Sequence, residues 1–111
     1  MPLIFHLTYK GDWEEARATG EYTAPSLEEE GFIHCSKDIR QLLKVAERLY
    51  PGEAGLMVLD LDLDKIKSLL KYEPSRSGEV YPHIYGILNV DAVVRERVLE
   101  VDAVGKHFLE D

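Results

Sequence analysis

Hydrophobic and polar residues alternate in three separate stretches of this chain, residues 3–8, 56–63 and 93–101. Alternation with a period of two is typical of β-strands with one buried and one solvated face. Only one long stretch, between Asp38 and Pro51, carries its apolar residues at steps of three and four, which indicates an amphipathic helix. Because 111 residues fit one compact domain, the pattern predicts a single small α+β domain over residues 1–111.

Shorter elements are expected between these stretches. Two capping-box patterns, Asp12 with Glu15 and Ser26 with Glu29, predict where two short helices begin. A glycine that can end a helix follows each pattern. The other expected elements are a strand over 32–36, a short helix over 64–70, a strand that starts at 71–73, a loop over 74–78 and an extended segment over 81–86.

The composition excludes some classes of partner. The chain has 21 acidic and 13 basic side chains, and the net charge of −8 repels phosphate backbones, so we expect no general nucleic-acid binding. No apolar run approaches the roughly 20 residues that span a bilayer, so we expect no membrane partner. Neither a signal-peptide pattern nor a second cysteine is present, which favours a cytoplasmic location.

Three of the four histidines lie in segments of one design, an imidazole two residues away from a hydroxyl. The pairs are His6 with Thr8, His34 with Ser36, and His83 with both Tyr81 and Tyr85. Residues two apart on a strand share a face, so each segment offers both groups on one side. A domain of this size has about one sizeable cleft, in which the three strands could converge. The alternative is that each histidine is a structural residue with its own hydrogen bonds.

Other chemistry-bearing residues are expected to be structural or solvated. Cys35 alternates with His34 and should therefore be buried in the apolar layer, where it would not act as a nucleophile. Asp60, Asp62 and Asp64 resemble a ladder of cation ligands, but the glycine and glutamate of an EF-hand are missing, so a solvated strand face is favoured. His107, in a polar C-terminal segment, is expected to be solvated.

Several motifs, taken together, resemble a known family. They are His6-Leu-Thr, Trp13, the string Glu-Gly-Phe-Ile-His-Cys-Ser at 30–36 and the string Tyr-Pro-His-Ile-Tyr-Gly at 81–86. In that order they look like the bacterial family called domain of unknown function 952. That family is in turn similar to the ADP-ribosyltransferase-like fold, with split antiparallel β-sheets, flanking helices and NAD in the cleft between the sheets.

The resemblance implies an NAD-dependent or nucleotide-handling transferase, similar to ADP-ribosyltransferases or to tRNA 2′-phosphotransferases. It implies a small-molecule or nucleotide partner and NAD as the cofactor. The expected catalytic residues are His34 and His83, and the expected cofactor-binding residues are His6, Thr8, Ser36 and Tyr85. The chain departs from most transferases of this fold because no catalytic glutamate follows the last strands, where only Glu79 and His83 stand.

Two further functions remain open from the residues. His6, His34 and His83 could instead be three ligands of a hydrolytic zinc ion, or the cleft could belong to a non-catalytic module that binds a metabolite. Protonated imidazoles donate from both nitrogens, so a nucleotide at His6 and His34 should bind more tightly at pH 6 than at pH 8. Zinc needs neutral imidazole and predicts the opposite trend.

Overall fold

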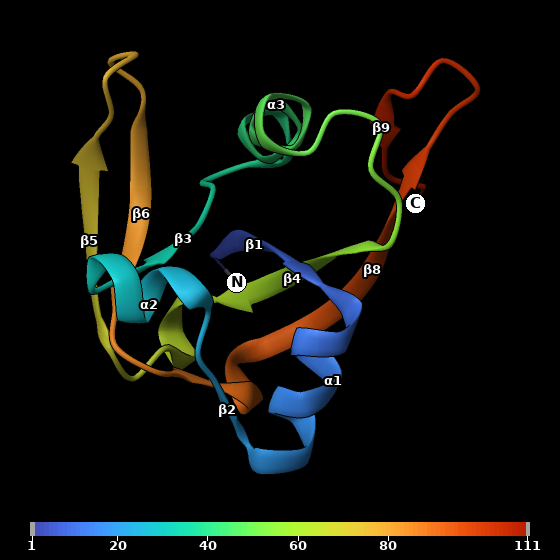
Figure 1. Ribbon diagram of the computed structural model, residues 1–111. Helices are drawn as coiled ribbons and strands as arrows, with labels where there is room; N and C mark the ends of the chain where they lie inside the picture. Colours follow the sequence, from blue (N-terminus) through green and yellow to red (C-terminus); the bar gives the residue numbers. More distant parts are fainter. Residues whose placement is uncertain (1, 111) are drawn as a thin grey trace.

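The computed structural model describes residues 2–110, which form an α+β fold with antiparallel sheets and helices around them (Figure 1). The largest sheet has the strand order β1-β4-β8-β9, with bounds Leu3–Tyr9, Leu56–Asp62, Val93–Val101 and His107–Phe108. A second sheet has the order β3-β6-β5, with bounds Ile33–His34, Val80–Tyr85 and Leu69–Pro74. A short pair joins β2 (Glu21–Tyr22) to β7 (Leu88–Asn89).

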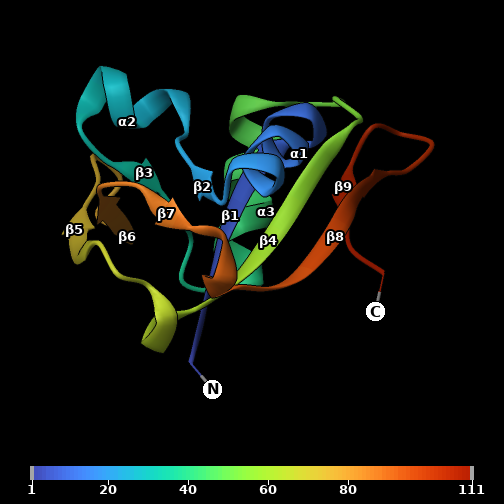
Figure 2. The same cartoon turned by 90° about the horizontal axis from the view of Figure 1, so that it is seen from below.

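Three α-helices lie around these sheets in the described part of the chain: α1 (Lys10–Thr19), α2 (Pro25–Glu30) and α3 (Ile39–Leu49). Two single 3₁₀ turns cover Leu63–Lys65 and Val90–Ala92. Seen from below, β1 and β4 cross the middle of the molecule, with the hairpin of β5 and β6 on one side and β8 with β9 on the other (Figure 2). No helix in residues 2–110 is long and apolar enough to cross a membrane.

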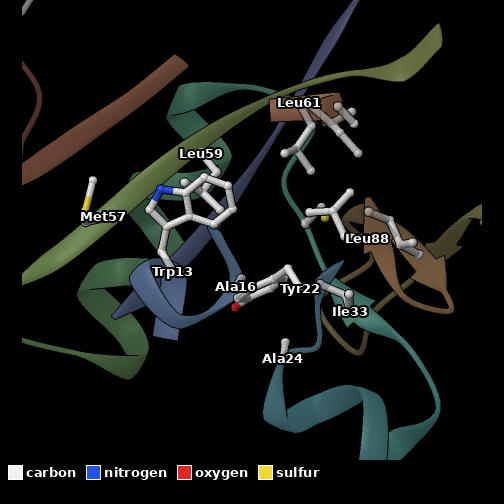
Figure 3. Packing of buried hydrophobic residues seen from close by; sticks show 13 residues of the cluster. Trp13, Ala16, Tyr22, Ala24, Ile33, Met57, Leu59, Leu61 and Leu88 are labelled. Atoms are coloured by element: carbon white, nitrogen blue, oxygen red, sulfur yellow. The ribbon is translucent and has the colours of Figure 1, made fainter. Parts of the chain in front are cut away.

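Strand β4 is the centre of the fold, because it pairs with β1 and β8 and is buried along its whole length. Helix α3 covers one face of its sheet, where Leu42 and Ala46 pack against Val58. On the other face, Trp13 of α1 lies over Leu59, in the cluster that Figure 3 shows. The expectation that β4 has one solvated face is therefore wrong.

The two aspartates of β4 show how the strand tolerates this burial. Asp60 is only 3% exposed, and its Oδ1 accepts a hydrogen bond of 2.8 Å from the Arg97 guanidinium on the neighbouring β8. Asp62 is also buried, and its carboxylate accepts from the backbone N–H of Asp64 at the start of a 3₁₀ turn. Buried polar groups need such partners, and here a second strand and a turn supply them.

Some local expectations are confirmed. Helix α3 begins after Asp38, whose Oδ1 accepts the backbone N–H of Gln41 at 2.7 Å, and β8 has the expected bounds. Cys35 is buried, as expected. The α+β class is confirmed by the three antiparallel sheets and the helices.

Other local expectations are wrong. Neither capping box exists: α1 starts after Tyr9 and α2 after Ala24, without a side-chain cap, because a strand end and Pro25 set the starting points. The helix expected over 64–70 is one 3₁₀ turn, after which pairing with β6 draws the chain into β5 from Leu69. The strand expected over 32–36 is shortened to two residues, although Ser36 still forms a backbone bridge to β1.

The C-terminal segment is anchored, which corrects the expectation of a solvated His107. This residue is 3% exposed, and its backbone N–H donates to the Glu47 carboxylate on α3 at 2.6 Å. Its ring Nε2 lies 3.0 Å from the carbonyl oxygen of Glu53. The short strand β9 is thereby fastened against α3, whose other side helps to form the cleft described next.

Candidate functional site

A cleft of about 650 Å³ opens where the four-stranded sheet meets the three-stranded sheet. Strand β1 lines it with residues 5–9, β3 and β6 line it with two histidines, and the last turns of α3 add an apolar and basic side. The volume lies in the range of small-molecule sites. The bridge between Phe5 and Ser36 joins the two sheets at this place, with backbone hydrogen bonds of 2.8 and 2.7 Å.

All three histidines of the repeated design lie on this one cleft. His34 and His83 are directly opposite each other on β3 and β6, and their ring centroids are 5.3 Å apart. His6 comes from β1 and is only 5% exposed. All three histidines therefore line one cleft, as the period-two pattern predicts, but only the His34 and His83 rings are in contact.

His6 already uses both ring nitrogens inside the protein. Nδ1 lies 2.6 Å from the backbone carbonyl oxygen of His34, which can only accept, so Nδ1 carries the proton. Nε2 lies 2.8 Å from the Tyr22 hydroxyl. Burial lowers the pKa of His6 to about 4, so the ring is neutral at physiological pH. The expectation that a doubly protonated His6 binds a phosphate is therefore wrong.

Tyr22 connects His6 to Thr8 under the cleft. Its hydroxyl oxygen is 2.8 Å from both the His6 Nε2 and the Thr8 Oγ1, and burial raises its pKa above the ordinary value. All three side chains are buried and all three line the cleft. Sequence reasoning paired His6 with Thr8 correctly but missed the tyrosine, which lies 14 residues beyond Thr8, in a two-residue strand with no clear pattern.

His34 and Ser36 share the cleft but differ in their surroundings. The His34 side chain is 53% exposed, and its Nε2 lies 2.8 Å from the Glu30 carboxylate at the end of α2. Ser36 is buried, and both its backbone groups bond to Phe5. His34 is therefore free to meet a ligand, whereas Ser36 also serves to join the two sheets.

His83 is held more firmly than His34. Its Nδ1 lies 2.8 Å from Oε1 of Glu73, and its ring stacks on Phe32 with centroids 4.1 Å apart and planes inclined by 23°. The Tyr85 hydroxyl donates to the same Glu73 oxygen at 2.5 Å. Tyr85 is not among the residues that line the cleft, so the structure does not support its expected contact with a cofactor ring.

Two donors lower the pKa of Glu73. The larger effect comes from the Tyr85 hydroxyl and the next from His83, and the carboxylate in turn raises the pKa of Tyr85. The sequence analysis did not identify Glu73 as a site residue. The loop expected over 74–78 could have located it, because such a loop closes a hairpin and sets which residues face each other. A hairpin closed by that loop places Glu73 opposite Tyr81, one diagonal step from His83.

The three-histidine zinc site is not supported. Within residues 2–110, no three histidine, cysteine or acidic side chains are placed to hold a metal ion. The reason is visible at His6, where a carbonyl oxygen and a hydroxyl occupy the two nitrogens. Cys35 lines the cleft, yet it is only 4% exposed, and burial raises the pKa of its thiol, which keeps it uncharged.

The fold and the cleft define a small α+β protein with a histidine-lined pocket between two antiparallel sheets. Residues 7–96 match the family described as protein of unknown function (DUF952), and the chain belongs to that family. The expected resemblance to this family is confirmed. No curated protein matches the chain in sequence.

Solved structures of one bacterial protein share the fold. The crystal structure of CC0527 from Caulobacter crescentus is 33% identical, covers 96% of this chain and 93% of its own, and has a TM-score of 0.85. The solution NMR structure of the same protein is 34% identical, covers 96% and 91%, and has a TM-score of 0.81. These similarities extend over nearly the whole length of the chain.

Proposed function

We propose that the cleft binds a nucleotide and that the protein is a group-transfer enzyme. NAD is the cofactor implied by the resemblance of the family to ADP-ribosyltransferase-like proteins, in which NAD lies between two sheets. One observation supports this most: the cleft lies between two antiparallel sheets and brings His34 and His83 together with two hydroxyl residues, Thr8 and Ser36.

The cleft residues fit NAD in their chemistry. Tyr9 and Tyr50, whose rings pack edge to face at 5.8 Å, offer aromatic surface for a flat ring. Thr8 and Ser36 are suited to ribose hydroxyls. Arg48 of α3 is the one arginine or lysine that lines the cleft among the described residues, and it would meet the diphosphate. Bound NAD would supply an ADP-ribosyl group with nicotinamide as its leaving group.

The two accessible histidines take different parts in this proposal. His83 would act as the acid–base group, because its imidazole lines the cleft and is fixed against the Glu73 carboxylate. His34, half-exposed at the cleft, would position the ribose. His6 would position His34 indirectly, through its hydrogen bond to the backbone carbonyl oxygen of that residue.

Titration calorimetry with NAD, ADP-ribose and nicotinamide tests the proposal, together with chromatography that detects released nicotinamide. We expect NAD to bind, His83→Ala to abolish nicotinamide release and His34→Ala to weaken binding by about tenfold, or ~1.4 kcal/mol. Arg95→Ala is the matched control, because this exposed residue of β8 does not line the cleft.

Binding of NAD with release of nicotinamide supports the proposal that the protein is a group-transfer enzyme. Binding without release in the wild type contradicts the transferase and leaves a metabolite-binding module. Absence of binding by all three compounds contradicts the nucleotide proposal.

A further inference from the structure

His83 is fixed on several sides although it lines an open cleft. Its side chain is 12% exposed, its ring stacks on Phe32, and its backbone lies in β6, the central strand of the three-stranded sheet. Nδ1 is turned toward Glu73, which does not line the cleft. The other ring nitrogen, Nε2, has no hydrogen-bond partner within the described residues 2–110 and is the atom left for a ligand.

Glu73 is itself held in place. The Tyr85 hydroxyl and the His83 imidazole donate to the same oxygen, Oε1, and Tyr85 lies two residues beyond His83 on β6. Glu73 comes from the neighbouring strand β5, in register with Tyr81. Two donors from one strand therefore fix a carboxylate on the next, so that neither the acid nor the imidazole needs to reorganise when a proton moves.

The pair of His34 and Glu30 lacks this support. Both side chains are about half exposed, at 53% and 50%, and they are neighbours four residues apart. Exposed ion pairs of this kind are mobile and contribute little free energy. The cleft therefore holds two imidazoles with carboxylate partners, of which His83 is the more buried and is the one whose carboxylate also accepts a tyrosine hydroxyl.

We propose that Glu73 is the positioning residue of the reaction. It keeps the proton of neutral His83 on Nδ1, so that the lone pair of Nε2 is directed to the cleft and would take the proton of the hydroxyl group that attacks C1′ of the nicotinamide ribose. The new C1′–O bond would form as the C1′–N bond to nicotinamide breaks, and nicotinamide would leave as a neutral molecule. The Glu73 carboxylate would stabilise the imidazolium, and Nε2 would then give its proton to water. Tyr85 fixes Glu73. This inference rests on the proposed function, since it assigns the proton transfer to His83.

The first test needs no ligand. Nitrogen-15 NMR of the histidine rings at pH 8.5 reports which nitrogen of each neutral ring carries the proton. We expect His83 to be protonated on Nδ1 in the wild type and to lose this preference in Glu73→Ala. Glu30→Ala is the matched control, because it removes the carboxylate of the other imidazole, and His83 should stay unchanged in it. A proton on Nε2 in the wild type, or no change in Glu73→Ala, would overturn the proposal.

The second test follows nicotinamide release from NAD across pH. Glu73→Ala should lower kcat by ~10²-fold with little change in KM, as expected for lost positioning of an acid–base group. Glu30→Ala should act mainly on KM. Equal losses of kcat in the two variants would contradict the role of Glu73. If the wild type releases no nicotinamide, the proposed function fails, and the NMR result still decides whether Glu73 sets the tautomer.

Discussion

The Nδ1 of His6 lies 2.6 Å from the backbone carbonyl oxygen of His34, a contact that ties β1 of the four-stranded sheet to β3 of the three-stranded sheet. It runs beside the backbone bridge between Phe5 and Ser36. A histidine expected to bind a ligand therefore also connects the two sheets on either side of the cleft. The contribution of His6 to the free energy of unfolding can be measured through its pH dependence.

His6 should make the free energy of unfolding depend on pH. Its pKa is about 4 in the fold and 6.5 as the ordinary value, so the unfolded chain takes up a proton first as the pH falls. The stability from neutral His6 is complete above pH 6.5 and is lost progressively toward pH 4. The difference corresponds to about 3 kcal/mol.

Urea unfolding of the wild type and His6→Asn at several pH values between 7 and 4.5 measures this effect. Asparagine can still donate to the His34 carbonyl but does not titrate, so the variant should be less stable at pH 7 and should show a flatter slope. Carboxylates titrate in both proteins and cancel in the comparison. Equal slopes would show that His6 does not remain neutral in the fold.

Removal of one partner from the ion pair of Asp60 and Arg97 should lower the free energy of unfolding substantially. Their side chains are 4% and 12% exposed, so Arg97→Met leaves a buried carboxylate without its partner and should cost about 3–5 kcal/mol. The double variant Asp60→Leu, Arg97→Met should recover most of this loss. Arg95→Met, on the exposed part of the same strand, should change stability by less than ~0.5 kcal/mol. A small loss in Arg97→Met would contradict the burial of Asp60.

Cys35 should be inert in the native protein. Because burial raises the pKa of its thiol, iodoacetamide at pH 8 should modify Cys35 only after unfolding, which mass spectrometry can follow. Cys35→Ala should cost about 1 kcal/mol and leave ligand binding intact. Rapid alkylation of the folded protein would mean that Cys35 is accessible from the cleft.

The features that could be predicted from the sequence depend on short-range periodicity. The spacing of apolar residues located α3 and β8, and the period of two placed three histidines on one cleft. Both inferences can be made from neighbouring residues alone, without knowing which distant segment packs against them.

The features that were missed depend on such partners. Asp60 is buried because Arg97 lies 37 residues further along the chain, and His107 is buried because Glu47 lies 60 residues before it. Glu73 joins the site only when β5 pairs with β6. A hydrophobic pattern predicts that each of these polar residues is solvated, because it does not contain the distant residue that forms the hydrogen bond.

An NMR titration of the nitrogen-15-labelled wild type with NAD tests the central claim most directly, because it shows whether and where the ligand binds. We predict saturable shifts, complete below about 1 mM, for the amide signals of Thr8, Ser36 and His83 around the cleft. Signals of Lys67 and Asn89, which line a separate groove, should stay in place. Absence of saturable shifts, or shifts confined to that groove, would contradict a nucleotide site at the histidine-lined cleft.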